Sequence, residues 1–296
     1  MRSISLCQSA VKPSPRRLIA LLGSFLGCFL LLGCSTTAPL KPAKAGPIRL
    51  ELKGQQGQVD TTRYYSHSRI QNYEEDQMVR ARDEIVDFKV KELVSKVDSP
   101  NGRLTVQATT ISKDGTVDLH DLAFPEKGEE IEYVFSRKGQ VYKAGDYPPD
   151  SVFFVPPIPL PEGEVQVGDT WTLDHAWLGM KNGIPLGVHL VAILKNVYQC
   201  GRDRCADVEV SGQVEMMGVA TGKAQFSSTI WGRLLIAEQR GTVVWSEVRS
   251  KERMIVPGAR TEVLSCMVAL LDLPKDLGRP SGLGASCKPS ENAVNL

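Results

Sequence analysis

The sequence predicts an all-β protein with mainly antiparallel strands and little helix. Apolar and polar residues alternate with a period of two in several long runs, most cleanly over 206–216. This period is typical of strands that bury one face. Turn-forming pairs such as Asn101-Gly102 and Asp114-Gly115 separate the runs, as they do in hairpins. Such strands build curved sheets, a sandwich or a half-barrel, and two similar β units are one arrangement that the pattern allows.

Each expected strand is a run of alternating or continuous apolar residues. In chain order the runs cover residues 48–52, 86–91, 103–108, 131–136, 186–194, 206–216, 224–238, 242–256 and 261–271. The stretch 72–84 is ambiguous, because its helix-forming residues carry opposed charges at helical spacing but few of them are apolar. We interpret it as a strand or an exposed connection rather than as a helix.

A proline-rich segment divides these strands into two predicted β units. Residues 148–167 hold six prolines, and proline cannot donate to a strand ladder, so this segment is expected to cross between the halves. The N-terminal β unit then covers 47–147 and the C-terminal β unit covers 168–273. The last residues, 274–296, are rich in Gly, Ser and Pro and are expected to be extended.

The N-terminus has the pattern of a secretory signal. A basic stretch ends at Arg16 and Arg17, and an apolar run of 15 residues follows over 18–32. The run is shorter than the roughly 20 residues of a membrane span, but it suits the core of a signal peptide. It ends at Leu31-Leu32-Gly33-Cys34.

This ending resembles the lipobox of bacterial lipoproteins. The resemblance implies that residues 1–33 are a signal peptide, that cleavage falls between Gly33 and Cys34, and that Cys34 carries the lipid. Residues 34–46 then form a flexible tether. Ser35 replaces the acidic residue of an inner-membrane retention signal, which favours an outer-membrane, periplasm-facing location and leaves the cell surface open. An ordinary signal peptide with an incidental cysteine is the alternative.

Four cysteines remain in the mature chain, and an even number in an oxidising compartment predicts two disulfides. Cys200 and Cys205 flank a polar loop between two strand-like runs, so we expect them to pair at the tip of a hairpin. Cys266 and Cys287 would then tie the tail to the last strand. Zinc binding is the alternative, but no histidine neighbours either pair, and we predict no metal and no cofactor.

One turn in the folded part stands out, at Val165-Gln166-Val167-Gly168-Asp169-Thr170-Trp171. With the proline-rich lead-in and the later strands, it resembles a family of secreted and lipid-anchored bacterial proteins of unknown function. The resemblance implies no activity. From the residues themselves, we expect Gly168 to adopt positive φ, Asp169 to accept turn hydrogen bonds and Trp171 to bury its ring. A catalytic Asp169 with Trp171 as a ligand platform is the functional alternative.

Composition and motifs point to a non-enzymatic envelope protein. The formal net charge of +1 excludes a strongly basic nucleic-acid binder. The four histidines, His67, His120, His175 and His189, form no catalytic motif, so no catalytic residue is predicted. The protein would contact the membrane through its anchor and hold a lipid or apolar guest, or bind an envelope partner through an exposed patch or strand edge. The alternative is a hydrolase acting on peptidoglycan, lipid or peptide.

Overall fold

The computed structural model describes residues 41–43, 46–122, 124–147, 160–179, 184–217, 225–274, 277–278 and 282–290, all within one compact unit that spans residues 37–296. The lipobox with Gly33 and Cys34, most of the tether and most of the proline-rich segment lie outside the described residues. Within the described part of the chain, no helix is long and apolar enough to pass through a membrane.

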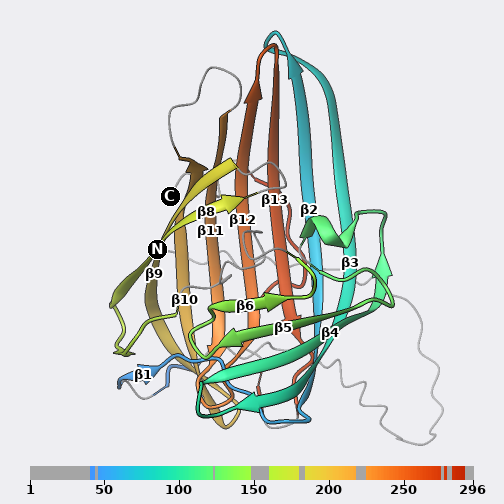
Figure 1. The fold of residues 1–296 in the computed structure, drawn as a ribbon. Coiled ribbons are helices and arrows are strands. Elements are labelled where there is room, and N and C mark those ends of the chain that lie inside the picture. The colour runs from blue at the N-terminus through green and yellow to red at the C-terminus, as the bar shows by residue number, and fades with distance from the viewer. Residues whose placement is uncertain are drawn as a thin grey trace, which may run out of the picture. The chain divides into compact units, whose positions relative to one another are not determined.

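The described residues fold almost entirely as antiparallel strands, which confirms the predicted all-β class (Figure 1). The single helical element described is the short 3-10 helix η1 (Leu119–Leu122). The strands of the large sheet are β2 (Val59–Glu74), β3 (Gln77–Asp98), β4 (Arg103–Asp114), β5 (Glu130–Ser136), β6 (Val141–Ala144), β8 (Thr170–Gly179), β9 (Ile184–Cys200), β10 (Asp203–Met216), β11 (Gln225–Ala237), β12 (Thr242–Val256) and β13 (Ala259–Leu271). A separate pair joins β1 (Ile48–Arg49) to β7 (Glu164–Val165).

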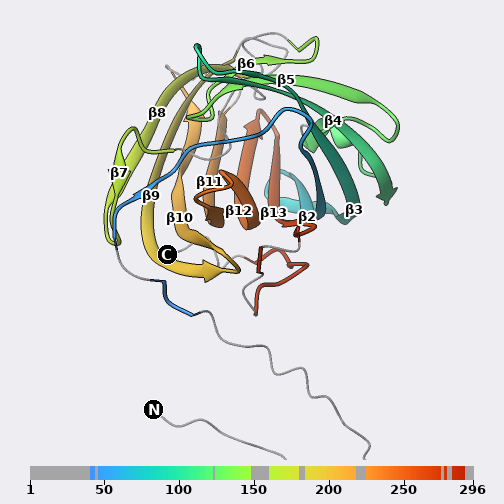
Figure 2. The same ribbon diagram turned by 90° about the horizontal axis from the view of Figure 1, so that it is seen from below.

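The large sheet has eleven strands in the order β6-β5-β4-β3-β2-β13-β12-β11-β10-β9-β8. Strands that lie side by side in the sheet follow one another in the chain, except at the centre, where β2 pairs with β13. That pairing places the strands of both predicted β units in one sheet. Strands β6 and β8 are its two edges, and Figure 2 shows that the sheet curls strongly between them.

The ambiguous stretch 72–84 forms the end of β2, a tight turn and the start of β3, which confirms the extended interpretation over the helical one. The turn places Glu75 and Asp76 at positive φ, a conformation that Asp tolerates better than most residues. Charges of this stretch pair in part with residues of other strands. Arg260 on β13 donates to Asp76 at 3.0 Å and lies 4.1 Å above the ring of Tyr73.

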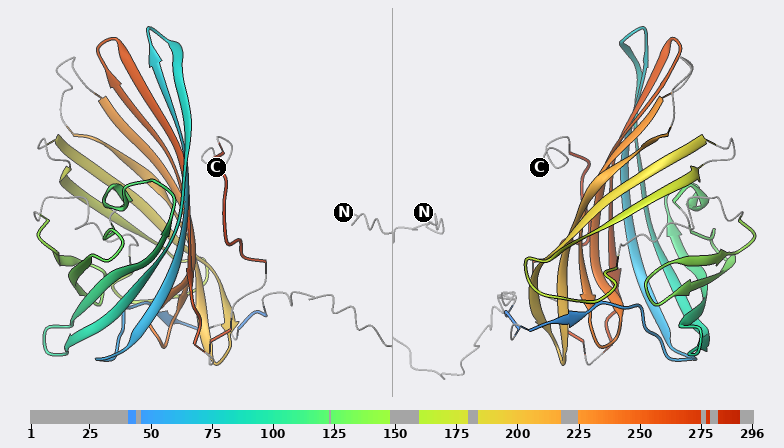
Figure 3. Two further views of the ribbon diagram at one scale, coloured as in Figure 1. Left: turned by 90° about the vertical axis from the view of Figure 1, so that its right-hand side faces the viewer. Right: turned by 60° about the vertical axis from the view of Figure 1, so that its left-hand side comes forward.

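The outer face of the sheet is covered in part by the C-terminal tail, which lies along it in dark red in Figure 3. A disulfide joins Cys287 in the tail to Cys266 on β13. The indole of Trp245 on β12 donates to the carbonyl of Gly284 at 2.9 Å, and Arg249 reaches the carbonyl of Lys288 at 3.1 Å. A small apolar core forms beneath the tail.

Both expected disulfides are present. The Cys200–Cys205 bond closes the turn between β9 and β10, and the Cys266–Cys287 bond holds the tail against β13. In the part of the chain that the structure describes, no group of three or more His, Cys, Asp or Glu residues could hold a metal ion.

A segment that we call the strap, residues 46–58, crosses the lower end of the curled sheet (Figure 2). Its backbone bonds to turns that lie far apart in the sheet order. The amide of Leu52 donates to the carbonyl of Arg137 between β5 and β6 at 2.7 Å, and the amide of Lys53 donates to that of Gly241 between β11 and β12 at 3.1 Å. The strap therefore joins the two halves of the open sheet.

The contact between the strap and Gly241 can be tested by substitution. A Cβ at this position would lie 2.5 Å from the backbone of Glu51 and of Lys53, and φ is +64°. Gly241→Ala is expected to lower the free energy of unfolding by about 3 kcal/mol, since both left-handed strain and backbone overlap oppose it. Urea unfolding of residues 37–296, the compact unit, measures this.

Gly258→Ala is the matched control. Gly258 also has positive φ, +79°, but nothing lies within 4 Å of the added Cβ, so only the backbone cost of about 1 kcal/mol is expected. Equal losses for the two variants would show that the strap contributes nothing at Gly241.

Candidate functional site

The inner face of the curled sheet is the candidate site, and strand alternation identifies its residues. Cys266 faces the tail on the outer side, so its neighbours Ser265 and Met267 on β13 face inward. A residue paired directly with an inward residue on the neighbouring strand also faces inward, so the inner face can be followed from β13 to the other strands. The inner face has a closed lower part and a more open upper part, which differ in chemistry.

The lower part is a closed apolar core between the strap and strands β9 to β11. Ile48 and Leu50 of the strap are fully buried. They pack in one cluster with inward residues of the sheet such as Leu194, Val208 and Leu234. Burial of such side chains contributes about 1.5–3 kcal/mol each, so the strap closes this end firmly.

Above this core, strands β8 to β11 form an apolar wall that is only partly buried. The side chains that border the core on this wall share two properties, being apolar and keeping part of their surface exposed. They are Trp171, Leu173, Val214, Met216, Phe226 and Ile230. No described segment buries these side chains fully, so the wall presents apolar surface to the interior of the curled sheet.

At the same level of the sheet, the inner face of strands β12, β13 and β2 forms a polar wall. One row of paired inward residues changes from apolar to serine as it crosses the sheet from β9 to β2: Leu190, Gly212, Ile230, Ser250, Ser265 and Ser68. The next row up holds Val188, Val214, Ser228, Glu252, Val263 and Ile70. The first row is therefore apolar on one side and polar on the other, whereas the polar residues of the second row are Ser228 and Glu252 at its centre.

The polar wall carries a connected group of hydrogen bonds. The hydroxyl of Ser250 donates to Oε1 of Glu252 at 3.1 Å, and the hydroxyl oxygens of Ser250 and Ser265 lie 2.6 Å apart. Burial raises the pKa of Glu252 above its usual value, and the bond from Ser250 opposes that rise in part. Ser228, directly opposite Glu252 on β11, is only 5 % exposed.

A second inward carboxyl, Glu92 on β3, lies near the strap. Its partner across the strand pair is Asp60 on β2, which accepts hydrogen bonds from Gln58 at 2.7 Å and from Arg240. Burial and, next, the charge of Asp60 raise the pKa of Glu92 to about 7. The charge of Glu92 in turn helps to raise the pKa of Tyr133, after burial.

The raised pKa of Glu92 predicts a pH dependence of stability. A carboxyl with a pKa of 4.5 when unfolded and about 7 when folded favours the folded state at low pH, and this contribution is lost as pH rises through 7. Between about pH 5 and about pH 8 this group is expected to lower the free energy of unfolding by about 1–3 kcal/mol. Glu92→Gln should remove this part of the dependence of the free energy of unfolding on pH.

Urea titrations of the native chain and of Glu92→Gln at the two pH values measure the effect. Glu130→Gln, at an exposed position on β5, is the control and should leave the slope unchanged. If native protein and Glu92→Gln lose stability equally, Glu92 does not titrate in this range.

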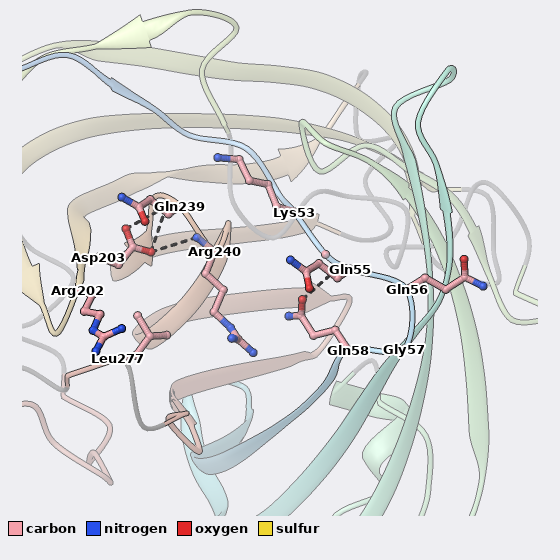
Figure 4. Close-up of a pocket in the computed structure, with 11 residues that line it drawn as sticks. Lys53, Gln55, Gln56, Gly57, Gln58, Arg202, Asp203, Gln239, Arg240 and Leu277 are labelled. Carbon is pink, nitrogen blue, oxygen red and sulfur yellow. Dashed lines mark hydrogen bonds between the residues drawn. The ribbon is translucent and has the colours of Figure 1, made fainter.

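A hollow of about 740 Å³ opens beside the strap at the lower end (Figure 4). It is mainly polar, and its cations are Lys53, Arg202 and Arg240. The carboxylate of Asp203 accepts from the amides of Gln239 and Arg240 at 3.0–3.1 Å, so this acid holds the turn between β11 and β12. We interpret the hollow as part of the strap's attachment.

The predicted turn has the expected geometry at Gly168 and Asp169, whereas the ring of Trp171 is only partly buried. Gly168 has a φ of +97°, and the carboxylate of Asp169 accepts from the amide of Gln166 at 2.8 Å. Trp171 packs against the apolar core at the start of β8. Asp169 is exposed and holds its own turn, while Trp171 belongs to the inner apolar wall, which the sequence did not indicate.

Three histidines lie beside acids, away from the polar wall. On the outer face, Nδ1 of His189 is 2.9 Å from Asp174 and Nε2 of His67 is 3.4 Å from Asp83. Beside η1, Nε2 of His120 is 2.7 Å from Glu129. The side chain of His175 lies outside the described residues. Among those described, no serine or cysteine accompanies these pairs in a bonded triad.

The polar wall was missed from the sequence. Ser250 and Glu252 on β12 are spaced by two residues, as are inward residues of any strand. That spacing was the available signal, but it does not say which face points inward. Ser265 is brought next to Ser250 only by the pairing of β12 with β13.

Comparison with known proteins identifies no family. No family model and no curated protein matches the chain. Among solved structures, an outer membrane channel from Pseudomonas putida F1 is 11 % identical, with a TM-score of 0.21 over 74 % of this chain and 97 % of that one. A DUF1329 family protein from Desulfovibrio piger is 8 % identical, with a TM-score of 0.12 over 75 % and 87 %. A LolA superfamily protein from Nitrosomonas europaea is 9 % identical, with a TM-score of 0.13 over 75 % and 90 %. Likenesses this low support no conclusion about fold or function.

Proposed function

We propose that this chain is a lipid-anchored envelope protein that binds an apolar or lipid ligand on the inner face of its sheet and is not an enzyme. The observation that carries the proposal is the apolar wall of β8 to β11. Its side chains border a buried core yet remain partly exposed. Apolar surface inside a concave sheet is stabilised when a ligand excludes water from it.

The position of the anchor fits this function. The lipobox resemblance implies Cys34 as the lipid attachment site, and Ser35 after it favours the outer membrane, facing the periplasm, as the location. Residues 41–43 run beside the lower end of β9, where the amide of Ala43 donates to the carbonyl of Val197 at 2.9 Å. The tether thus meets the sheet at its strap end, and the polar and apolar walls lie above the strap.

An envelope protein partner is the second candidate. Exposed apolar side chains gather near the far ends of two hairpins, with Met78 and Val79 on β3 and Met254 on β12 exposed by 56 %, 54 % and 41 %. Such a patch favours contact with a protein. The hydrolase alternative has less support, because the described histidine–acid pairs lie away from the polar wall.

Ligand binding on the apolar wall can be tested with paired valine substitutions. Val214 on β10 faces inward and borders the core, whereas Val191 on β9 faces outward and is 46 % exposed. Val214→Asp is expected to weaken binding of the neutral fluorescent probe N-phenylnaphthylamine at least about tenfold, since burying an unpaired charge against the probe is unfavourable. Val191→Asp should bind the probe as the native unit does.

A fluorescence titration of residues 37–296 gives the affinities, and thermal unfolding confirms that each variant is folded. Val214→Trp provides a second test without a charge, because its bulk should also displace the probe. Equal probe binding by native protein, Val214→Asp and Val214→Trp would contradict the proposal.

A further inference from the structure

The polar wall beside the apolar wall calls for an explanation of its own. A carboxyl and several hydroxyls on the inner face of a sheet lose contact with water, which is unfavourable unless hydrogen bonds replace that contact. Ser228 is nearly fully buried, and Glu252 is partly buried. For Glu252, the hydrogen bond that the structure shows comes from Ser250.

No cation balances Glu252 among the described residues of the inner face. Its direct neighbours across the strands are Ser228 on β11 and Val263 on β13. The cation in the same row is Arg82 on β3, three strands away, or about 14 Å at ordinary strand spacing. Arg82 itself donates to Glu84 at 2.7 Å.

The hydrogen bonds also have a direction. Ser250 has one hydroxyl proton and donates it to Glu252. The short contact between Ser250 and Ser265 then uses the proton of Ser265. In this series of hydrogen bonds, the hydroxyl proton of Ser265 is donated to Ser250 and that of Ser250 is donated to Glu252. These three side chains therefore offer a ligand hydrogen-bond acceptors, namely the second carboxylate oxygen of Glu252 and the free lone pair of Ser265.

We propose that Glu252, Ser250 and Ser265 bind the polar headgroup of an amphiphile whose headgroup donates hydrogen bonds, through hydroxyls or an ammonium group. The apolar chain of the ligand lies along Val214, Ile230 and the rest of the β8–β11 wall. This inference rests on the proposed ligand-binding function and adds the chemical class of the ligand. It disfavours carboxylate-headed lipids, because a second carboxylate is repelled by Glu252 and the protons of Ser250 and Ser265 are already donated within the wall.

Three probes with the same dodecyl-length chain test the headgroup: dodecylamine, monolauroylglycerol and laurate. Each is titrated against residues 37–296 by displacement of N-phenylnaphthylamine at neutral pH, below the concentration at which it forms micelles. Laurate is expected to bind at least about tenfold more weakly than the better of the other two, a difference ordinary for one unfavourable charge contact. Preference between amine and glyceride tells whether an ammonium or a hydroxyl headgroup is the natural donor.

Glu252→Gln keeps the size of the side chain and removes the charge, so it should bring the three affinities within about threefold of each other. Ser265→Ala, which removes one acceptor, should weaken the donor headgroups and leave laurate unchanged. Glu262→Gln on β13 is the matched control, because Glu262 faces outward and pairs with Arg260 at 3.1 Å. It should behave as the native unit.

The outcomes separate this inference from the function beneath it. If all three amphiphiles bind equally to native protein and to Glu252→Gln, the headgroup assignment is overturned while apolar binding stands. If neither N-phenylnaphthylamine nor any amphiphile binds, both the headgroup assignment and the proposed function are overturned.

Discussion

The strap imposes the constraint on which the rest of the structure depends. An open sheet of eleven strands has two free edges, β6 and β8, and nothing in strand pairing alone sets how tightly it curls. Backbone bonds from the strap to the β5–β6 turn and to the β11–β12 turn connect distant parts of the sheet at one end. The buried Ile48 and Leu50 add apolar contact at the same place. The strap therefore fixes the curvature of the sheet at its lower end.

Because the strap closes the lower end, the inner and outer faces of the sheet differ in what covers them. The outer face is covered in part by the tail, which a disulfide and the bond from Trp245 hold in place. The inner face is closed below by the strap and keeps an apolar wall and a polar wall above it. A lipid anchor at Cys34 would join the chain from the strap end, so the closed end would lie nearer the membrane than the ligand-binding walls.

Local sequence patterns predicted most of the strands but not their arrangement. The run 206–216 was recognisable because alternation is a local signal, and β10 covers it. The Cys200–Cys205 pair was predictable because both residues flank one turn. Pairing of β2 with β13 was not, since no local pattern reports a contact between residues about 200 positions apart. The polar wall depends on that same non-local arrangement, so the two-residue spacing of Ser250 and Glu252 could not show that both face inward.

Native mass spectrometry of the 37–296 unit, secreted into a periplasm, tests the central claim most directly. The protein is measured as purified and again after extraction with organic solvent. We expect bound amphiphile as an added mass that extraction removes, and two disulfides in both samples. A single mass, equal to that of the polypeptide before and after extraction, would contradict ligand binding on the inner face and would direct attention to the exposed tips of the hairpins.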